Sequence, residues 1–130
     1  MEAATTVPEK IRVLIADDHR LFAQALEAIL ATEEGIDVAG HASDGAEAVK
    51  LALALSPDVV LMDISMPVMD GFEATAQIRR QRPYAAVLML TGSNSRKDVD
   101  RAREAGAVGY VTKDRIAAEL IESIVAAVPR

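Results

Sequence analysis

The chain has 130 residues, of which 51% are hydrophobic, and 14 Lys and Arg against 20 Asp and Glu give it a formal net charge of -6. This length favours one domain with a single core. The absence of cysteine excludes disulfides and thiolate metal sites, and the acidic balance argues against direct binding to nucleic acid, whose affinity comes largely from neutralising phosphates.

The first residues look like a tail and the rest like a folded domain. Residues 1–9 lack the basic and apolar regions of a signal peptide, so we expect a disordered tail there and a domain over residues 10–130. No apolar run is long enough to span a membrane. The expected location is the cytoplasm.

Two strand–helix pairs open the domain. Residues 11–16 form an apolar strand that ends at Asp17-Asp18, and the helix that follows, capped by Asp18, runs to Gly35. Residues 36–41 form a more polar strand, which suits a sheet edge. The next helix begins at a capping box in residues 44–47 and ends at Pro57.

The strand in the middle of the chain is the most apolar. Residues 59–62 are Val-Val-Leu-Met, the pattern of a strand buried on both faces, and the run stops at the carboxylate of Asp63. Open α/β sheets bind their ligands at the carboxyl ends of their strands. Asp63 is therefore a candidate functional residue.

Three further pairs complete the domain. Asp70 caps a helix over residues 71–81, and the apolar strand 85–90 ends at Thr91. A helix over residues 95–105 is poor in apolar residues. A short strand over residues 108–111 leads to Lys113, and the last helix, residues 115–128, has an apolar stripe wide enough for core packing or for a partner.

Strands and helices that alternate in this way predict a doubly wound α/β fold with a five-stranded parallel sheet, a flavodoxin-like (βα)5 arrangement. The order 2-1-3-4-5 puts the three most apolar strands inside and is one of the two common arrangements. Its switch point lies between the first and third strands. We therefore expect Asp17, Asp18 and Asp63 to converge there.

Five polar side chains are predicted on this rim: Asp17, Asp18, Asp63, Thr91 and Lys113. Three close carboxylates repel one another unless a cation intervenes, and oxygen ligands suit Mg²⁺. An ammonium and a hydroxyl on the other side would complete the surroundings of a phosphoryl group on Asp63. Histidines His19 and His41 are expected to be exposed, with no spacing that makes them metal ligands with these acids.

The motifs resemble the receiver domain of bacterial two-component response regulators. They are Asp17-Asp18, residues 62–71 (Met-Asp-Ile-Ser-Met-Pro-Val-Met-Asp-Gly), Thr91-Gly92 and residues 106–113, in the same order and spacing over residues 10 to 128. The Asp-Asp-His opening and the ending at residues 109–114 are most similar to the subfamily with a carboxyl-terminal helix-turn-helix DNA-binding domain, and we find no such domain in this sequence.

The resemblance implies a phosphorylation-activated signalling switch that controls transcription. Asp63 would accept a phosphoryl group from a phosphohistidine of a sensor histidine kinase. Asp18, Asp63 and the backbone carbonyl of Ser65 would bind Mg²⁺, and Asp17 would hold a metal-bound water. The chain would catalyse only its own phosphoryl transfer and slow autodephosphorylation.

The resemblance also implies a conformational response. Lys113 would pair with a phosphoryl oxygen, Thr91 would move to bond another, and Tyr110 would follow inward from solvent. The surface of the fourth predicted helix, fifth strand and fifth helix would shift and control dimerisation or an output domain. Asp114 stands where many receivers have a proline, so it could compete for the ammonium of Lys113.

Two other functions remain open. The first is a receiver-like interaction module that works without phosphorylation. The second is an aspartyl-phosphate phosphatase, although such enzymes usually carry a second acid two residues after the nucleophile, where this chain has Ser65.

Overall fold

Strands and helices alternate throughout the computed structural model, which describes residues 10–92 and 95–128. The expected tail at residues 1–9 lies outside the described residues. The elements are β1 (Ile11–Ala16), α1 (Arg20–Leu30), β2 (Ile36–Ala42), α2 (Gly45–Leu55), β3 (Val59–Asp63), α3 (Gly71–Gln81), β4 (Ala86–Thr91), α4 (Arg96–Ala105), β5 (Gly109–Thr112), the 3₁₀ turn η2 (Lys113–Arg115) and α5 (Ile116–Ala127).

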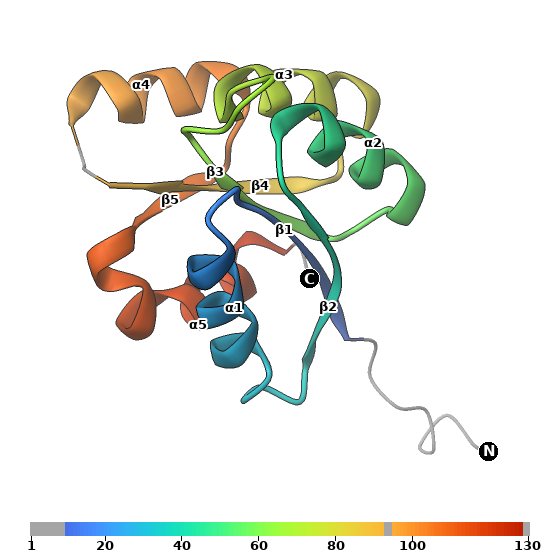
Figure 1. Cartoon of the computed structure of the whole chain (residues 1–130), viewed down its shortest axis with the longest axis vertical. Coiled ribbons are helices and arrows are strands. Elements are labelled where there is room, and N and C mark those ends of the chain that lie inside the picture. Colours follow the sequence, from blue (N-terminus) through green and yellow to red (C-terminus); the bar gives the residue numbers. More distant parts are fainter. Residues whose placement is uncertain (1–9, 93–94, 129–130) are drawn as a thin grey trace.

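The five strands form one parallel sheet in the order β2-β1-β3-β4-β5, which confirms the predicted topology (Figure 1). Every residue of β3 and β4 is buried, whereas β2 and β5 carry exposed residues, as expected for edge strands. Strands β4 and β5 each lie one residue further along the chain than predicted, so Thr91 and Thr112 pair within the ladder.

Helices cover both faces of the sheet: α2, α3 and α4 lie on one face and α1 and α5 on the other (Figure 1). Alternate strand residues point to opposite faces, so Val13 and Leu61 pack with α1 and α5, while Leu14 and Met62 pack with α2 and α3. The two cores meet only through the sheet.

Side-chain caps begin three of the helices. Oxygen Oδ1 of Asp44 accepts a hydrogen bond from Glu47 N at 2.7 Å, and Asp70 does the same for Glu73 N at 2.9 Å. Ser95 caps α4 in the same way. These contacts satisfy amide groups that the first helical turn leaves without partners, and they confirm the caps predicted for α2 and α3.

The prediction that Asp18 caps α1 is wrong. Helix α1 begins at Arg20, its N-cap residue is His19, and no side chain caps it. Instead Asp17 Oδ1 accepts a hydrogen bond from His19 N at 2.8 Å. Asp18 comes one residue too early to reach the first helical amides, and its carboxylate lies beside Asp17 and His19. Within the described residues, no helix is both long and apolar enough to cross a membrane.

Candidate functional site

Two adjacent strands bring the acidic side chains together. Ala16 at the end of β1 pairs with Met62 of β3, so Asp17 and Asp18 follow one strand where Asp63 ends the other. One carboxylate oxygen from each of Asp17, Asp18 and Asp63 lies within 4.8 Å of the others. The predicted convergence of the three acids at the switch point is confirmed.

Lys113 closes the site from the side of β5. Its Nζ lies 3.1 Å from Asp63 Oδ1 and 3.9 Å from Asp17 Oδ2, and it also lies 4.6 Å from the centre of the Phe22 ring. Among the described residues the ion pairs of Lys113 are with these two acids, so Asp114 does not take its ammonium. Asp17 is fully buried and Asp63 is 3% exposed, whereas the Lys113 side chain is 28% exposed, so the acids of both pairs are shielded from water and the ammonium is only partly so.

Burial raises the pKa of the Asp63 carboxyl group, because the charged form loses its hydration. The negative charge of Asp17 raises this pKa further and that of Asp18 adds to the effect, while the charge and hydrogen bond of Lys113 lower it. The raising effects exceed the lowering ones. Lys113 therefore does not offset the combined effect of burial and the neighbouring acids on this pKa.

The residues present fit a divalent metal ion. Oxygens Asp17 Oδ2 and Asp63 Oδ2 are buried and have no hydrogen-bond partner, an arrangement that is costly unless another group binds them. The acids supply hard oxygen donors, which suit Mg²⁺. Three carboxylates against one ammonium leave two negative charges, which a divalent ion would neutralise.

A cavity of about 300 Å³ opens over Asp63. Ser65, Thr91 and Lys113 line it together with Asp63, so the structure brings four of the predicted site residues to one space. Thr91 is 4% exposed at the end of β4, whereas Ser65 is exposed in the loop after β3. The functions predicted for these residues remain predictions.

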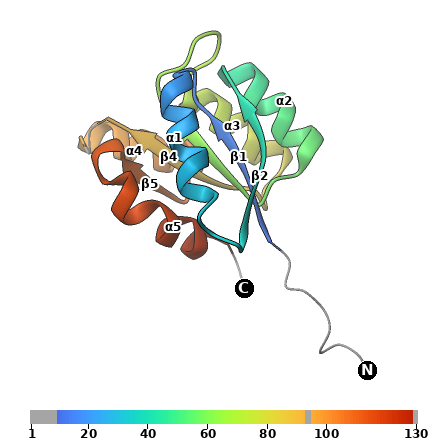
Figure 2. The ribbon, with the colours of Figure 1, turned by 60° about the horizontal axis from the view of Figure 1, so that its bottom comes forward.

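The loop between β3 and α3 is held against the sheet by close backbone packing. Gly71 N donates a hydrogen bond to Ile64 O at 2.8 Å, and a Cβ at Gly71 would lie 2.2 Å from Asp63 O. Only glycine fits there. In Figure 2 this loop stands at the same end of the molecule as the start of α1.

Tyr110 lies away from the acids, on the edge strand β5, and is 41% exposed. A cavity of about 120 Å³ between α4 and β5 adjoins it, lined also by Val99 and Ala102, and another of about 270 Å³ separates it from α5. The structure therefore leaves space beside the ring on both sides. It does not join Tyr110 to the other candidate residues.

The expectation that His19 is exposed is confirmed, but the expectation that it has no metal-ligand spacing to the acids is wrong. Its Nδ1 lies 3.6 Å from Asp17 Oδ1 and 3.5 Å from Asp18 Oδ1, and it belongs to the same group of possible ligand atoms. His19 also lines the cavity over Asp63. The available signal was its position immediately after Asp17-Asp18 at a strand end.

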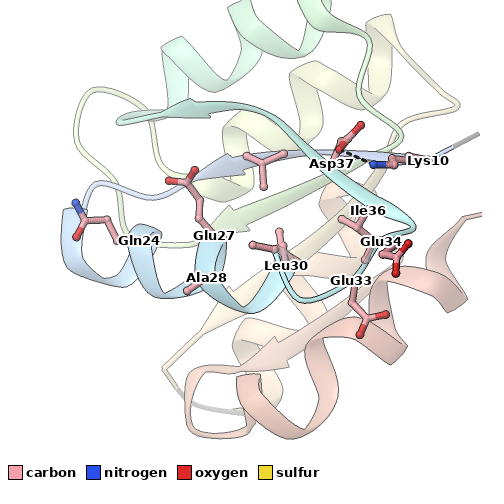
Figure 3. Close-up of a pocket in the computed structure, with 11 residues that line it drawn as sticks. Lys10, Gln24, Glu27, Ala28, Leu30, Glu33, Glu34, Ile36 and Asp37 are labelled. Atoms are coloured by element: carbon pink, nitrogen blue, oxygen red, sulfur yellow. Dashed lines mark ion pairs between the residues drawn. The ribbon is translucent and has the colours of Figure 1, made fainter.

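A larger cavity lies elsewhere, beside the end of α1 and the start of β2 (Figure 3). It measures about 750 Å³, and a Lys10–Asp37 ion pair of 3.6 Å stands at its rim. Strand β2 begins opposite the first residue of β1, so this cavity lies at the amino ends of the strands. Ligand sites of parallel sheets lie at the other end, where the acids are.

Comparisons with known proteins agree on one family. Residues 13–125 match the family described as "Response regulator receiver domain". The transcriptional regulatory protein LiaR of Bacillus subtilis is 46% identical over 117 residues, which are 90% of this chain and 56% of LiaR. The chain thus spans little more than half the length of the curated regulators it matches.

Solved structures agree with the sequence relatives. The receiver domain of the putative response regulator NarL from Mycobacterium tuberculosis superposes with a TM-score of 0.87 at 35% identity, over 92% of this chain and 96% of that one. A chain of the CheX-CheY-BeF3-Mg+2 complex from Borrelia burgdorferi matches with a TM-score of 0.81 at 28% identity, over 97% and 93% of the two chains.

Proposed function

The chain belongs to the response regulator receiver domain family of two-component systems, and from this premise we propose that Asp63 accepts a phosphoryl group from a histidine kinase. Switching in response to phosphorylation is the general role of the family. The observation that carries the assignment to Asp63 is its carboxylate, buried at a strand end, with Oδ1 on the Lys113 ammonium and Oδ2 unpartnered.

In the proposed step, a carboxylate oxygen of Asp63 attacks the phosphorus of the kinase phosphohistidine. The P–N bond breaks as the P–O bond forms, and the departing imidazole nitrogen keeps the bonding electrons. Lys113 neutralises charge on the phosphoryl oxygens, and the Thr91 hydroxyl on the same cavity donates to one of them. The chain then has no separate substrate and catalyses only this transfer and a slow hydrolysis of its own acyl phosphate.

Asp18, Asp63 and the backbone carbonyl of Ser65 would hold Mg²⁺, with Asp17 binding through a water. When bound, the ion supplies positive charge against the phosphoryl oxygens. The two buried carboxylate oxygens that lack hydrogen-bond partners support this site, as does the presence of BeF3 and Mg+2 in the similar CheX-CheY complex. Binding would also hold Asp63 in the ionised form that a nucleophile needs.

The proposed output is a shift of the surface formed by α4, β5 and α5. Movement of Thr91 toward the phosphoryl group would vacate space at the end of β4, and Tyr110 would turn inward toward α4. The cavity beside the Tyr110 ring supports this movement, and so does the small buried surface of α4. The shifted surface would control homodimerisation or an output domain.

The proposed location of this chain is the cytoplasm, and its proposed partners are a sensor histidine kinase and, after phosphorylation, a second copy or an output domain. The name of LiaR, a transcriptional regulatory protein, supports transcription as the regulated process. Because the chain spans 56% of LiaR and is acidic, DNA contact is assigned to another domain and not to this one.

Intact mass spectrometry after incubation with acetyl phosphate and Mg²⁺ tests the proposal. We expect one phosphoryl adduct on the wild type, none on Asp63→Asn, and at least roughly tenfold slower formation on Asp18→Asn, because a metal contributes several kcal/mol to such a step. Asp114→Asn is the matched control, since Asp114 is an exposed acid beside Lys113, and it should keep the adduct.

An adduct that persists in Asp63→Asn would contradict the assignment of the acceptor. No adduct on the wild type, together with no binding of beryllofluoride, would contradict the switch and favour an interaction module that works without phosphorylation.

A further inference from the structure

His19 stands beside the acidic group with its imidazole directed at two of the acids. Nδ1 lies 3.6 Å from Asp17 Oδ1 and 3.5 Å from Asp18 Oδ1. One ligand atom from each of Asp17, Asp18, His19 and Asp63 falls within 4.8 Å of all the others. The site therefore offers one nitrogen donor in addition to its oxygens.

Hydrogen bonds hold the backbone of His19 at the start of α1. His19 N donates to Asp17 Oδ1 at 2.8 Å, and His19 O accepts from Ala23 N at 2.9 Å. As the N-cap residue of α1, His19 has an extended backbone, and its side chain makes no capping hydrogen bond. The helix thus anchors the residue and does not use the imidazole.

The distances are too long for direct hydrogen bonds, and the distance to Asp18 is compatible with a shared ion. Direct hydrogen bonds from a ring nitrogen to a carboxylate are about 2.7–3.2 Å long, and the two distances here are 3.5 and 3.6 Å. Donors bonded at roughly 2.0–2.2 Å to one ion lie about 3 Å or more apart. Independently, Asp17 Oδ2 and Asp63 Oδ2 are buried and lack hydrogen-bond partners, and the ion pair of Asp17 Oδ2 with Lys113 is long, at 3.9 Å; this supports binding of a further species by this group of side chains.

We propose that His19 is a direct nitrogen donor to the metal ion and that it makes the site prefer Mn²⁺ and later divalent transition metals over Mg²⁺. The inference rests on the metal site of the proposed function and adds a ligand and a selectivity to it. Imidazole is a poor ligand for Mg²⁺ but a common one for transition metals, whose affinity for nitrogen donors rises along the first-row series.

The test is electron paramagnetic resonance of Mn²⁺ added to the unphosphorylated full chain, with Mg²⁺ as competitor. In the wild type, electron spin echo modulation should show coupling of Mn²⁺ to an imidazole nitrogen. In His19→Gln the coupling should vanish. The affinity for Mn²⁺ should fall by roughly tenfold or more, whereas the affinity for Mg²⁺ should fall by less than about twofold. The chain has two histidines, so His41→Gln is the matched control and should retain the coupling.

Three outcomes would overturn the inference. In the first, the wild type binds Mn²⁺ tightly without nitrogen coupling, and Asp18→Asn abolishes the binding. This result would remove His19 from the metal site and leave the proposed function intact. If His19→Gln weakens the binding of Mn²⁺ and of Mg²⁺ equally, His19 does not make the site prefer Mn²⁺. Binding that Asp18→Asn does not affect would overturn both the inference and the metal site of the proposed function.

Discussion

Val68, in the loop between β3 and α3, adopts a backbone conformation that its side chain disfavours. Its φ is 71°, in the left-handed region, and among the described non-glycine residues it shares a positive φ only with Ser56. Branching at Cβ makes this conformation costly, by about 1–3 kcal/mol. The side chain is 83% exposed, so packing of the valine does not offset that cost.

Val68→Asn should therefore stabilise the protein by about 1 kcal/mol, since asparagine adopts the left-handed region readily. Urea unfolding followed by circular dichroism measures the change. Val108→Asn is the matched control, because Val108 is also exposed, at 52%, and lacks a positive φ; it should give no gain. Equal changes in the two variants would contradict the strain at Val68.

Asp63 should make the metal-free protein less stable at neutral pH than at acid pH. Its pKa is raised in the folded state above the ordinary 3.8 by burial and by Asp17, so the folded form binds a proton more tightly than the unfolded form. The stability that protonated Asp63 contributes to the folded state is fully present below pH 3.8, and it is lost as the pH rises through the folded-state pKa.

Asp63→Asn should thus be more stable than the wild type at pH 7 in EDTA, by on the order of 1 kcal/mol, and the difference should shrink as the pH falls toward the ordinary aspartate value. Thermal unfolding at a series of pH values measures it. Asp114→Asn, which removes an exposed carboxylate, should show a smaller difference. A wild type that is the more stable of the two at pH 7 would show that Lys113 outweighs burial.

At the scale of elements, α4 differs from its neighbour α3. Helix α4 buries only Ala102, whereas α3 buries Gly71, Phe72, Ala74, Thr75 and Ile78. The guanidinium of Arg101 lies over the Phe72 ring at 4.1 Å and joins the two helices. A helix with so little buried surface opens at a small free-energy cost.

Backbone amides of residues 96–105 should accordingly exchange hydrogen faster than those of residues 71–81, as mass spectrometry of proteolytic fragments would measure. Arg101→Ala should increase exchange in α4 further, because it removes the contact with Phe72. Arg96→Ala, at the exposed first position of the same helix, should not. Equal protection of α3 and α4 would contradict the low local stability of α4.

The whole molecule carries a net charge of -6, and its most buried negative charges lie at one edge of the sheet. Binding of Mg²⁺ there should stabilise the folded chain, since the ligands converge only when β1 and β3 pair. A ligand at 100 times its dissociation constant contributes about 2.7 kcal/mol. The ion should therefore act on global unfolding and not only on the site.

We expect Mg²⁺ to raise the Tm by several degrees in the wild type and by much less in Asp18→Asn, measured by calorimetry. Sodium chloride at matched ionic strength controls for general screening of the acidic surface. The prediction is wrong if the two salts raise the Tm equally, or if Asp18→Asn responds to Mg²⁺ as the wild type does.

The sequence by itself determined the sheet, the helices and the edge at which the acids meet. Apolar runs such as residues 59–62 must be buried on both faces, so their strands lie inside the sheet, and alternating helices require parallel strands. An acid that ends such a strand then lies at the carboxyl edge. Caps such as Asp44 and Asp70 were also predictable from the sequence, because each cap joins residues only three positions apart.

Only the tertiary structure decided how the side chains at that edge are paired. It directed the Lys113 ammonium to Asp63 and not to the adjacent Asp114, and it left one oxygen of Asp17 and one of Asp63 without a hydrogen-bond partner. It also brought His19 to the acids in place of a cap by Asp18. Burial follows from the local pattern of residue types. A contact between side chains of separate segments depends on strand register, backbone torsions and rotamers together, which no single stretch of sequence specifies.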